Sequence, residues 1–226
     1  RFELIRGDES KVPFNYHKTT TYGVNLNSYF TTQLGKTAFG IETRNEDIIS
    51  TKLGETLDEP KHINGTSRNY DKGANRTNIS LHLEHNILLK RFTLSAGCMA
   101  TMNTGLINHS FRLYPGVDAS FQLLEPWKIY VSYNTSLRMP TFTELYYTTN
   151  ETHQGNKNLK PEEMQAFEIG SKYLSSGIQF TLSTYYHKGK NMIDWVRETD
   201  KTIWKSVNYT HINTLGIETS SLFNLK

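Results

Sequence analysis

Apolar and polar side chains alternate along most of this chain. Between Lys18 and Gln33, for example, Tyr22, Val24, Leu26 and Phe30 share one parity, while the positions between them are mostly polar. Successive side chains of a β-strand point to opposite faces of a sheet, so this alternation predicts a strand with one apolar and one polar face. The same sorting recurs in eight later runs, at residues 36–44, 78–87, 91–100, 110–123, 127–136, 161–174, 177–188 and within 204–221.

The run from Pro161 to Leu174 also has features of a helix. A proline at a first helical position, followed by two acidic residues, is typical of a helix start. As a strand, the same run places Phe167, Ile169 and Tyr173 on one face, and the Ile-Gly pair in its middle is unfavourable inside a helix. We therefore predict a strand here.

The connections between these runs alternate in length. Four are tight turns, and the connections between them are longer and polar. If every strand reverses direction, all tight turns lie at one end of the sheet and all long loops at the other. This layout is typical of bacterial outer-membrane barrels, whose strands need only about 9–11 tilted residues to cross. We expect tight turns at 33–36, 88–91, 124–126 and 175–177, and long loops at 45–73, 102–109, 138–162 and 191–202.

The predicted fold class is all-β, an antiparallel up-and-down meander. About nine strands, counted from Lys18, are expected to form a partial segment of a large transmembrane β-barrel. Single-chain bacterial barrels normally close with an even number of strands, so nine strands indicate a fragment of a longer barrel. The alternative is a soluble β-sandwich, which also alternates but turns its apolar face toward a core.

The side chains of both faces favour the barrel. The chain has 13 tyrosines and 11 phenylalanines, and aromatic residues near the ends of the runs suit the girdle at a membrane interface. Charged residues on the polar face suit a wet lumen. The aromatic residues are Tyr22, Trp127, Tyr133, Tyr173 and Tyr186, and the charged residues are Arg44, Glu84, Arg112, Asp118, Glu168 and Lys172.

Composition and motifs exclude several other classes of protein. The chain has 25 Lys and Arg against 22 Asp and Glu and no dense basic run, so no nucleic-acid partner is expected. The single cysteine, Cys98, excludes an internal disulfide and any multi-cysteine metal site. No apolar stretch reaches the roughly 18 residues of a membrane helix. The GxSxG, HExxH and phosphate-binding glycine motifs do not occur, so we expect neither an enzyme nor a cofactor or metal site.

One stretch departs from the alternation. SLRMPTFTELYYTTNETHQGNKNLKPEE, from Ser136 to Glu163, contains two prolines, five threonines and a turn-prone Gly-Asn-Lys-Asn run, so we expect neither a good helix nor a good strand there.

This stretch resembles the barrel of TonB-dependent outer-membrane receptors. In that family a strand ending in Ser-x-Arg-x-Pro-x-Phe-x-Glu-Leu-Tyr enters an extracellular loop, and Gly-Asn-x-x-Leu-x-Pro-Glu leads into the next strand. Tyr114 to Val117 and Asn213 to Glu218 resemble flanking strands of the same barrel. The resemblance implies a structural role for the matching residues, which are Arg138, Pro140, Glu144, Gly155, Asn156, Asn158, Leu159, Pro161 and Glu162.

The resemblance also implies a domain organisation and a function. Residues 1–226 are expected to be a single segment of such a barrel, with the plug domain absent and the barrel incomplete at both ends. The implied function is energy-dependent uptake of a scarce, bulky solute across the bacterial outer membrane, either cobalamin, a ferric siderophore or haem. The implied partners are this ligand, outer-membrane lipid, and the TonB energy-coupling complex, reached through the plug region. A soluble β-sandwich that binds a ligand is the alternative function.

Ligand contacts are expected in the long loops of the barrel. Two of these loops, 45–73 and 138–162, carry aromatic and polar side chains that can stack on a large polar ligand or hydrogen-bond to it. The candidate contact residues are Arg68, Tyr70, Tyr146, Tyr147, His153 and Gln154.

Overall fold

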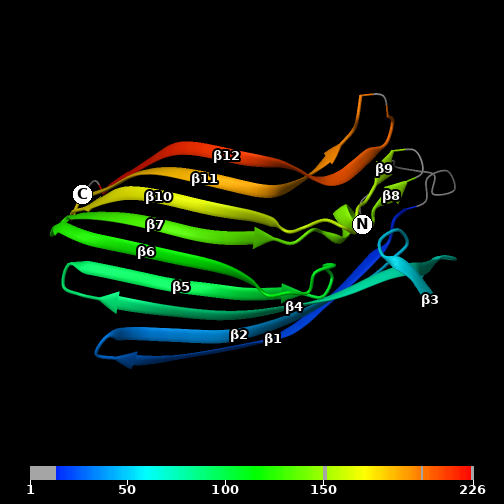
Figure 1. Cartoon of the computed structure of the whole chain (residues 1–226), viewed down its shortest axis with the longest axis horizontal. Helices are drawn as coiled ribbons and strands as arrows, with labels where there is room; N and C mark the ends of the chain where they lie inside the picture. The colour runs from blue at the N-terminus through cyan, green and yellow to red at the C-terminus, as the bar shows by residue number, and fades with distance from the viewer. Residues whose placement is uncertain (1–13, 150–151, 200, 225–226) are drawn as a thin grey trace.

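Nine long strands, neighbouring one another in chain order, make up most of the molecule (Figure 1). The computed structural model describes residues 14–149, 152–199 and 201–224. All eight contacts between neighbouring long strands are antiparallel, which confirms the all-β meander and the strand prediction for the run after Pro161. The long strands are β1 (His17–Thr32), β2 (Gly35–Ser50), β4 (Asn69–Leu88), β5 (Phe92–Asn103), β6 (Arg112–Leu124), β7 (Trp127–Arg138), β10 (Glu162–Leu174), β11 (Ile178–Val196) and β12 (Trp204–Phe223).

Short turns and long loops lie at opposite ends of this sheet, as predicted (Figure 1). The turns at 33–34, 89–91, 125–126 and 175–177 gather at one end, and the longer connections gather at the other. None of the helices within the described ranges is long and apolar enough to cross a membrane.

The long loops contain more regular structure than the sequence indicates. The connection expected at 45–73 is shorter, because β2 and β4 extend into it and β3 (Glu55–His62) pairs with β4. The stretch expected to form neither helix nor strand contains a helical turn, α1 (Phe142–Tyr146), and a small hairpin of β8 (Thr148–Thr149) and β9 (His153–Gln154). That expectation is therefore wrong in part.

A capping box explains the helical turn. The Glu144 amide donates to Thr141 Oγ1 at 3.2 Å, and the Thr141 amide donates to Glu144 Oε2 at 2.7 Å. These two bonds satisfy amide groups at the start of α1 that have no partner within the helix. The turn is thus stabilised by two side chains rather than by an apolar periodicity.

The register of the strands joins their apolar positions into continuous rows. One row crosses five neighbouring strands through Ala119, Val131, Ile169, Thr184 and Ile217, each paired with the next. Since the side chains of paired residues lie on the same face, the alternation within each strand becomes one apolar face of the whole sheet.

The apolar face is exposed and the polar face is the more shielded one. Ile169 is 56% exposed and Ile217 is 76% exposed, whereas Ser80, Thr101 and Ser183 on the polar face are buried. A sandwich would bury the apolar face under a second sheet. All described strands belong to one sheet, so the alternative of a β-sandwich is wrong.

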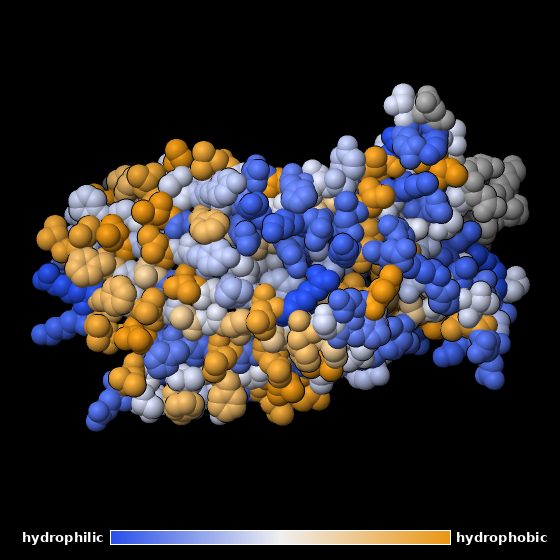
Figure 2. Space-filling model, viewed as in Figure 1, coloured by the Kyte–Doolittle hydropathy of each residue, from blue (hydrophilic) through white to orange (hydrophobic). Residues whose placement is uncertain are grey.

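Two rows of aromatic side chains cross the apolar face. Tyr133, Phe167 and Tyr186 are cross-strand neighbours, with ring centroids 4.7 Å and 6.4 Å apart. Nearer the short turns, Tyr173 pairs with Trp127 on one side and with Phe180 on the other. Six residues of β10 separate the rows, or about 20 Å at the usual rise of a strand. Figure 2 shows hydrophobic side chains gathered toward the turn end and hydrophilic ones toward the loop end.

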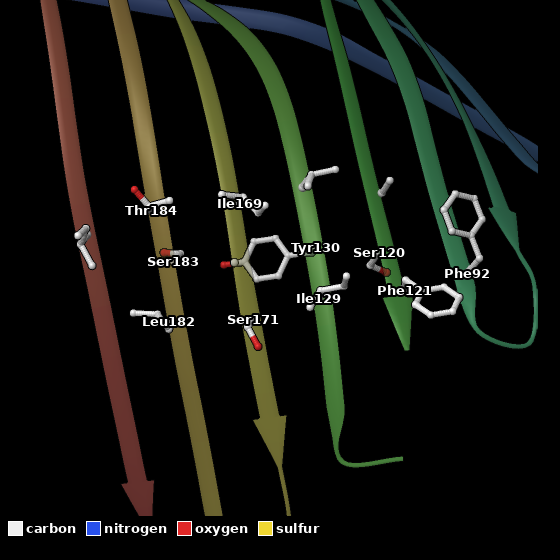
Figure 3. A pocket seen from close by; sticks show the side chains of 14 residues that line it. Phe92, Ser120, Phe121, Ile129, Tyr130, Ile169, Ser171, Leu182, Ser183 and Thr184 are labelled. Atoms are coloured by element: carbon white, nitrogen blue, oxygen red, sulfur yellow. The ribbon is translucent and has the colours of Figure 1, made fainter. Parts of the chain in front are cut away.

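Two tyrosines of the polar face lie over glycines of the neighbouring strand. A Cβ atom added to Gly170 would lie 2.4 Å from the Tyr130 ring, and one added to Gly216 would lie 2.2 Å from the Tyr185 ring. Figure 3 shows the Tyr130 ring lying across β10, and its hydroxyl donates to Glu168 at 2.7 Å. Glycine at these positions therefore lets an aromatic ring cover the backbone of the next strand.

Replacing Gly170 with alanine is expected to destabilise the barrel. The new methyl group displaces the Tyr130 ring and lengthens its bond to Glu168, at a cost of roughly 1–3 kcal/mol for overpacking. The measurement is urea unfolding of the full-length protein in lipid vesicles. Gly177→Ala is the matched control, because only one atom, at 3.9 Å, lies near an added Cβ in that turn. Equal unfolding midpoints for the two variants would contradict this prediction.

Candidate functional site

Arg138, at the loop end of β7, forms two bidentate ion pairs. Its guanidinium lies 2.6 and 2.7 Å from the two carboxylate oxygens of Glu162, the first residue of β10. It also lies 3.0 and 3.1 Å from the two oxygens of Glu144 in α1. The hydrogen bonds from Arg138 hold the pKa of Glu162 below its ordinary value. One side chain thus joins the strand that leaves the sheet, the helical turn that follows, and the returning strand.

Backbone contacts reinforce the same junction. Glu162 Oε1 accepts a further bond from the Ile193 amide at 2.7 Å, and both Pro140 and Pro161 are fully buried. A Cβ added to Gly155 would lie 2.8 Å from the Leu145 carbonyl oxygen, so only glycine fits there.

The remaining motif residues fold the returning arm of the loop. The Asn156 amide donates to the Glu144 carbonyl at 3.0 Å, and the Asn156 side chain accepts from the Asn158 amide at 2.9 Å. Leu159 is 3% exposed. These contacts support the structural role expected for the motif.

The loop also reaches across to β4 and β3. Arg76 of β4 donates to the Pro140 carbonyl at 2.6 Å, and its guanidinium lies 4.5 Å from the centroid of the Phe142 ring. Lys157 forms an ion pair with Glu55 of β3. The loop is therefore attached to a part of the sheet that lies several strands away from β7 and β10.

Tyr146 lies on this side of the loop. Its ring stacks on Phe142 with centroids 6.4 Å apart, and Lys157 Nζ lies 5.7 Å from its centroid. Burial raises the pKa of the Tyr146 hydroxyl, and the nearby Glu55 carboxylate raises it further. The phenol group, which is neutral at physiological pH even with its ordinary pKa of about 10, therefore stays protonated to a higher pH.

On the other side, the loop contacts the ends of β11 and β12. His153 in β9 pairs in parallel with Trp204, so the β8–β9 hairpin extends the sheet beyond β12 (Figure 1). The His153 ring lies 5.7 Å from Tyr147 and 5.2 Å from Trp195 of β11, in edge-to-face geometry. Tyr147, His153 and Trp195, all half-buried, form the loop cluster.

The structure divides the six predicted contact residues among separate places. Tyr147 and His153 lie together in the loop cluster, and Tyr146 faces β3. Arg68 donates to the Phe14 carbonyl and lies 5.4 Å from the Tyr16 ring, at the start of β1. Tyr70 pairs with Lys61 within the β3–β4 hairpin, and Gln154 is exposed and pairs with Lys205.

Sequence reasoning missed Arg76 and Trp195. Arg76 shares the parity of His82 and Glu84 in β4, so the alternation places it on the polar face once β4 is known to begin at Asn69. No local signal singles out Trp195, which joins the cluster only because the loop after β7 meets the end of β11. Arg76 also lines a polar cavity of about 390 Å³ beside Arg44, Glu46, Thr101, Asn103 and Arg138.

A second hollow, of about 570 Å³, lies across β6, β7, β10 and β11 (Figure 3). Apolar side chains dominate its lining, including Phe121, Ile129, Ile169 and Leu182. These residues belong to the exposed apolar face and its aromatic rows. The hollow is therefore part of that face and not of the polar loop region.

The fold and the loops together define the wall of a membrane-spanning β-barrel receptor. Its sheet has an exposed apolar face with aromatic rows, a polar face, short turns at one end and structured loops at the other. A family model described as "TonB dependent receptor-like, beta-barrel" matches residues 5–225. The chain belongs to this family of TonB-dependent receptor β-barrels.

Individual relatives agree with this family. The vitamin B12 transporter BtuB of Vibrio vulnificus (strain YJ016) is 26% identical over 163 residues, which cover 67% of this chain and 25% of that protein. The FrpB iron transporter of Neisseria meningitidis (F3-3 variant) superposes with a TM-score of 0.69 at 16% identity, covering 94% of this chain and 34% of that one. The siderophore receptor PirA of Pseudomonas aeruginosa gives 0.71 at 17% identity, covering 92% and 40%.

The family settles two of the expectations from the sequence. Its members are receptors and transporters rather than enzymes, and their barrels lie in the bacterial outer membrane. The chain spans only about a quarter to two fifths of the length of the relatives described above.

The ion pair between Arg138 and Glu162 is expected to make stability depend on pH. Because the pKa of Glu162 is lowered in the folded protein, its stabilising effect is complete above the ordinary carboxyl pKa of about 4.3 and is lost as pH falls through the lowered value. Urea midpoints of the complete receptor measured from pH 7 down to about 3 test this. Glu162→Gln should flatten the acid side of the curve, and Glu125→Gln in a short turn should not. Identical curves for Glu162→Gln and the unmodified receptor would contradict the assignment.

Proposed function

We propose that this chain is one segment of the barrel of an outer-membrane receptor that takes up a scarce, bulky solute. The solute is of the cobalamin, ferric siderophore or haem type. The names of the relatives support the first two of these, since they include vitamin B12, iron and siderophores. This chain matches only 25–40% of the length of those relatives, which supports a segment of a longer barrel. We infer that the complete receptor also contains a plug domain.

One observation carries the proposal, namely that the loop after β7 meets the end of β11 in the loop cluster, at the extracellular end. Tyr147 and His153 come from the loop after β7, and Trp195 comes from the end of β11. Their edge-to-face packing fixes the rings while each remains partly exposed. Rigid aromatic rings lose little entropy when they bind, and they suit a large ligand with flat or ring-shaped parts.

The polar cavity beside Arg76 supplies complementary chemistry on the inner face. Arg44 and Arg76 share Glu46 as an ion-pair partner, so their combined charge stays positive. Polar groups of a ligand can hydrogen-bond to Arg44, whose side chain is 53% exposed. The cavity and the cluster thus offer a polar and an aromatic surface at the same end of the barrel.

Two further partners complete the proposed function. The apolar face with its aromatic rows contacts outer-membrane lipid. Energy for release of the ligand into the cell comes from the TonB complex, which acts through the plug region of the complete receptor.

Removing one ring of the loop cluster is expected to weaken ligand binding. Tyr147→Leu in the complete receptor loses the contact with His153 and a stacking surface, so affinity should fall about 10-fold. The probes are vitamin B12, a ferric siderophore and haem, with binding followed by tryptophan quenching. The matched control is Tyr22→Leu on the apolar face of β1.

Two results would contradict the proposed function. One is that none of the three probes binds the unmodified receptor at micromolar concentration. The other is that Tyr147→Leu and Tyr22→Leu have the same affinity as the unmodified receptor for the probe that does bind.

A further inference from the structure

Strand β12 holds the returning arm of the 139–161 loop at two places. At its start, the Trp204 amide donates to the Thr152 carbonyl at 2.8 Å, next to the pairing of Trp204 with His153. Four residues further on, the side chain of Asn208 contacts Lys160. These two places lie about 13 Å apart along the strand. The arm that carries His153 is therefore fixed at both ends against one strand.

The Asn208 side chain bonds to three backbone groups. Its Oδ1 accepts from the Lys160 amide at 2.8 Å, and its Nδ2 donates to the Lys160 carbonyl at 2.9 Å. The same Nδ2 donates to the Asn191 carbonyl at 2.7 Å. Both donors and one acceptor of the amide are used, so the side chain binds Lys160 at two points, as a neighbouring strand does.

The third bond connects the loop with an irregular part of β11. Asn191 has a φ of +55°, in the left-handed region that non-glycine residues rarely adopt. The register between β11 and β12 shifts on both sides of Met192. Asn208 thus binds both the loop and the bulge after which β11 continues to Trp195.

The surrounding part of β12 is closely packed. Ser206, two residues before Asn208, is fully buried and is paired in register with Trp195, although the preceding residue, Lys205, is exposed. A small side chain at Ser206 allows this close approach. The contact between β12 and the two loops is therefore a packed interface with little freedom to shift.

We propose that Asn208 is a positioning residue for ligand binding. It binds the arm bearing His153 and the β11 bulge that leads to Trp195, and so it sets the spacing of the loop cluster. This inference rests on the proposed function of that cluster. It assigns a role to a residue that lies outside the motif between Arg138 and Glu162.

A substitution that removes only the hydrogen-bond donor of the Asn208 amide tests this role. Asn208→Asp has nearly the same shape, but it replaces the donor Nδ2 with a carboxylate oxygen that faces two backbone carbonyls. The bonds to the Lys160 and Asn191 carbonyls are lost, and like partial charges meet in their place. Asn108→Asp, in the exposed connection between β5 and β6, is the matched control, because the Asn108 side chain accepts a bond from the Ser110 amide at 3.1 Å and aspartate accepts it equally well.

Both variants are tested in the complete receptor, with two readouts. Hydrogen exchange of the Lys160 and Trp204 amides reports on the loop without any ligand. In Asn208→Asp, repulsion between the new carboxylate oxygen and the two carbonyls pushes the arm away, so the bond from the Lys160 amide is lost as well and its exchange should speed up about 10-fold. Asn108→Asp should leave this exchange unchanged. Affinity for whichever of vitamin B12, ferric siderophore or haem binds the receptor is the second readout, with an expected loss of about 10-fold for Asn208→Asp.

A double-mutant cycle separates positioning from a general loss of stability. If Asn208 acts through the loop cluster, Asn208→Asp weakens binding in the unmodified receptor but costs clearly less once Tyr147→Leu has disrupted the cluster. Equal losses in the two backgrounds would overturn the inference, as would unchanged affinity despite faster exchange at Lys160.

The outcomes for the two proposals are distinct. Slow exchange at Lys160 in Asn208→Asp rejects the inference whatever the ligand is. Failure of every probe to bind the unmodified receptor rejects the proposed function, and the positioning of a ligand site falls with it even if exchange at Lys160 speeds up.

Discussion

The antiparallel backbone ladder is the constraint on which the rest of this structure depends. Unpaired amide and carbonyl groups are costly in lipid, so a membrane wall must pair each strand with its neighbours over most of its length. In-register pairing then brings apolar positions of neighbouring strands to the same side, as in the row from Ala119 to Ile217. The aromatic rows, the polar inner face and the placement of all loops at one end follow from this single arrangement.

Much of the fold was predictable because its signals are local. Alternation identifies a strand, and turn residues end it, so the nine long strands and the four short turns follow from neighbouring residues alone. The structure inside the loops depends on partners far along the chain. Arg76 binds a carbonyl 64 residues away, and Lys157 pairs with Glu55 102 residues away, contacts that no local pattern records. The sequence therefore predicted Tyr147 and His153 as ligand contacts but not Trp195, because Trp195 reaches the cluster only through a contact with a residue far away in the chain.

The loop after β7 contains two groups of residues, one that holds the loop in place and one that remains available to a ligand. Arg138 is neutralised by two carboxylates, and Pro140, Leu159 and Pro161 are buried, so the family motif is occupied in holding the loop. The partly exposed rings of the loop cluster lie on the scaffold that these residues build. The rings of the loop cluster can therefore be changed without disturbing the contacts that fix the exit and return of the loop.

The attachment of one loop to both β4 and β12 has a mechanical consequence. Five long strands lie between these two in the sheet, so the loop acts as a chord across an arc of the wall. For an arc of given length, a chord of fixed length sets the radius. The wall can therefore change its curvature only if the bond from Arg76 to the loop or the contacts between the loop and β12 break. The loop thereby helps to determine the width of the lumen beneath it, and a ligand that draws the loop inward pulls on both sides of the arc at once.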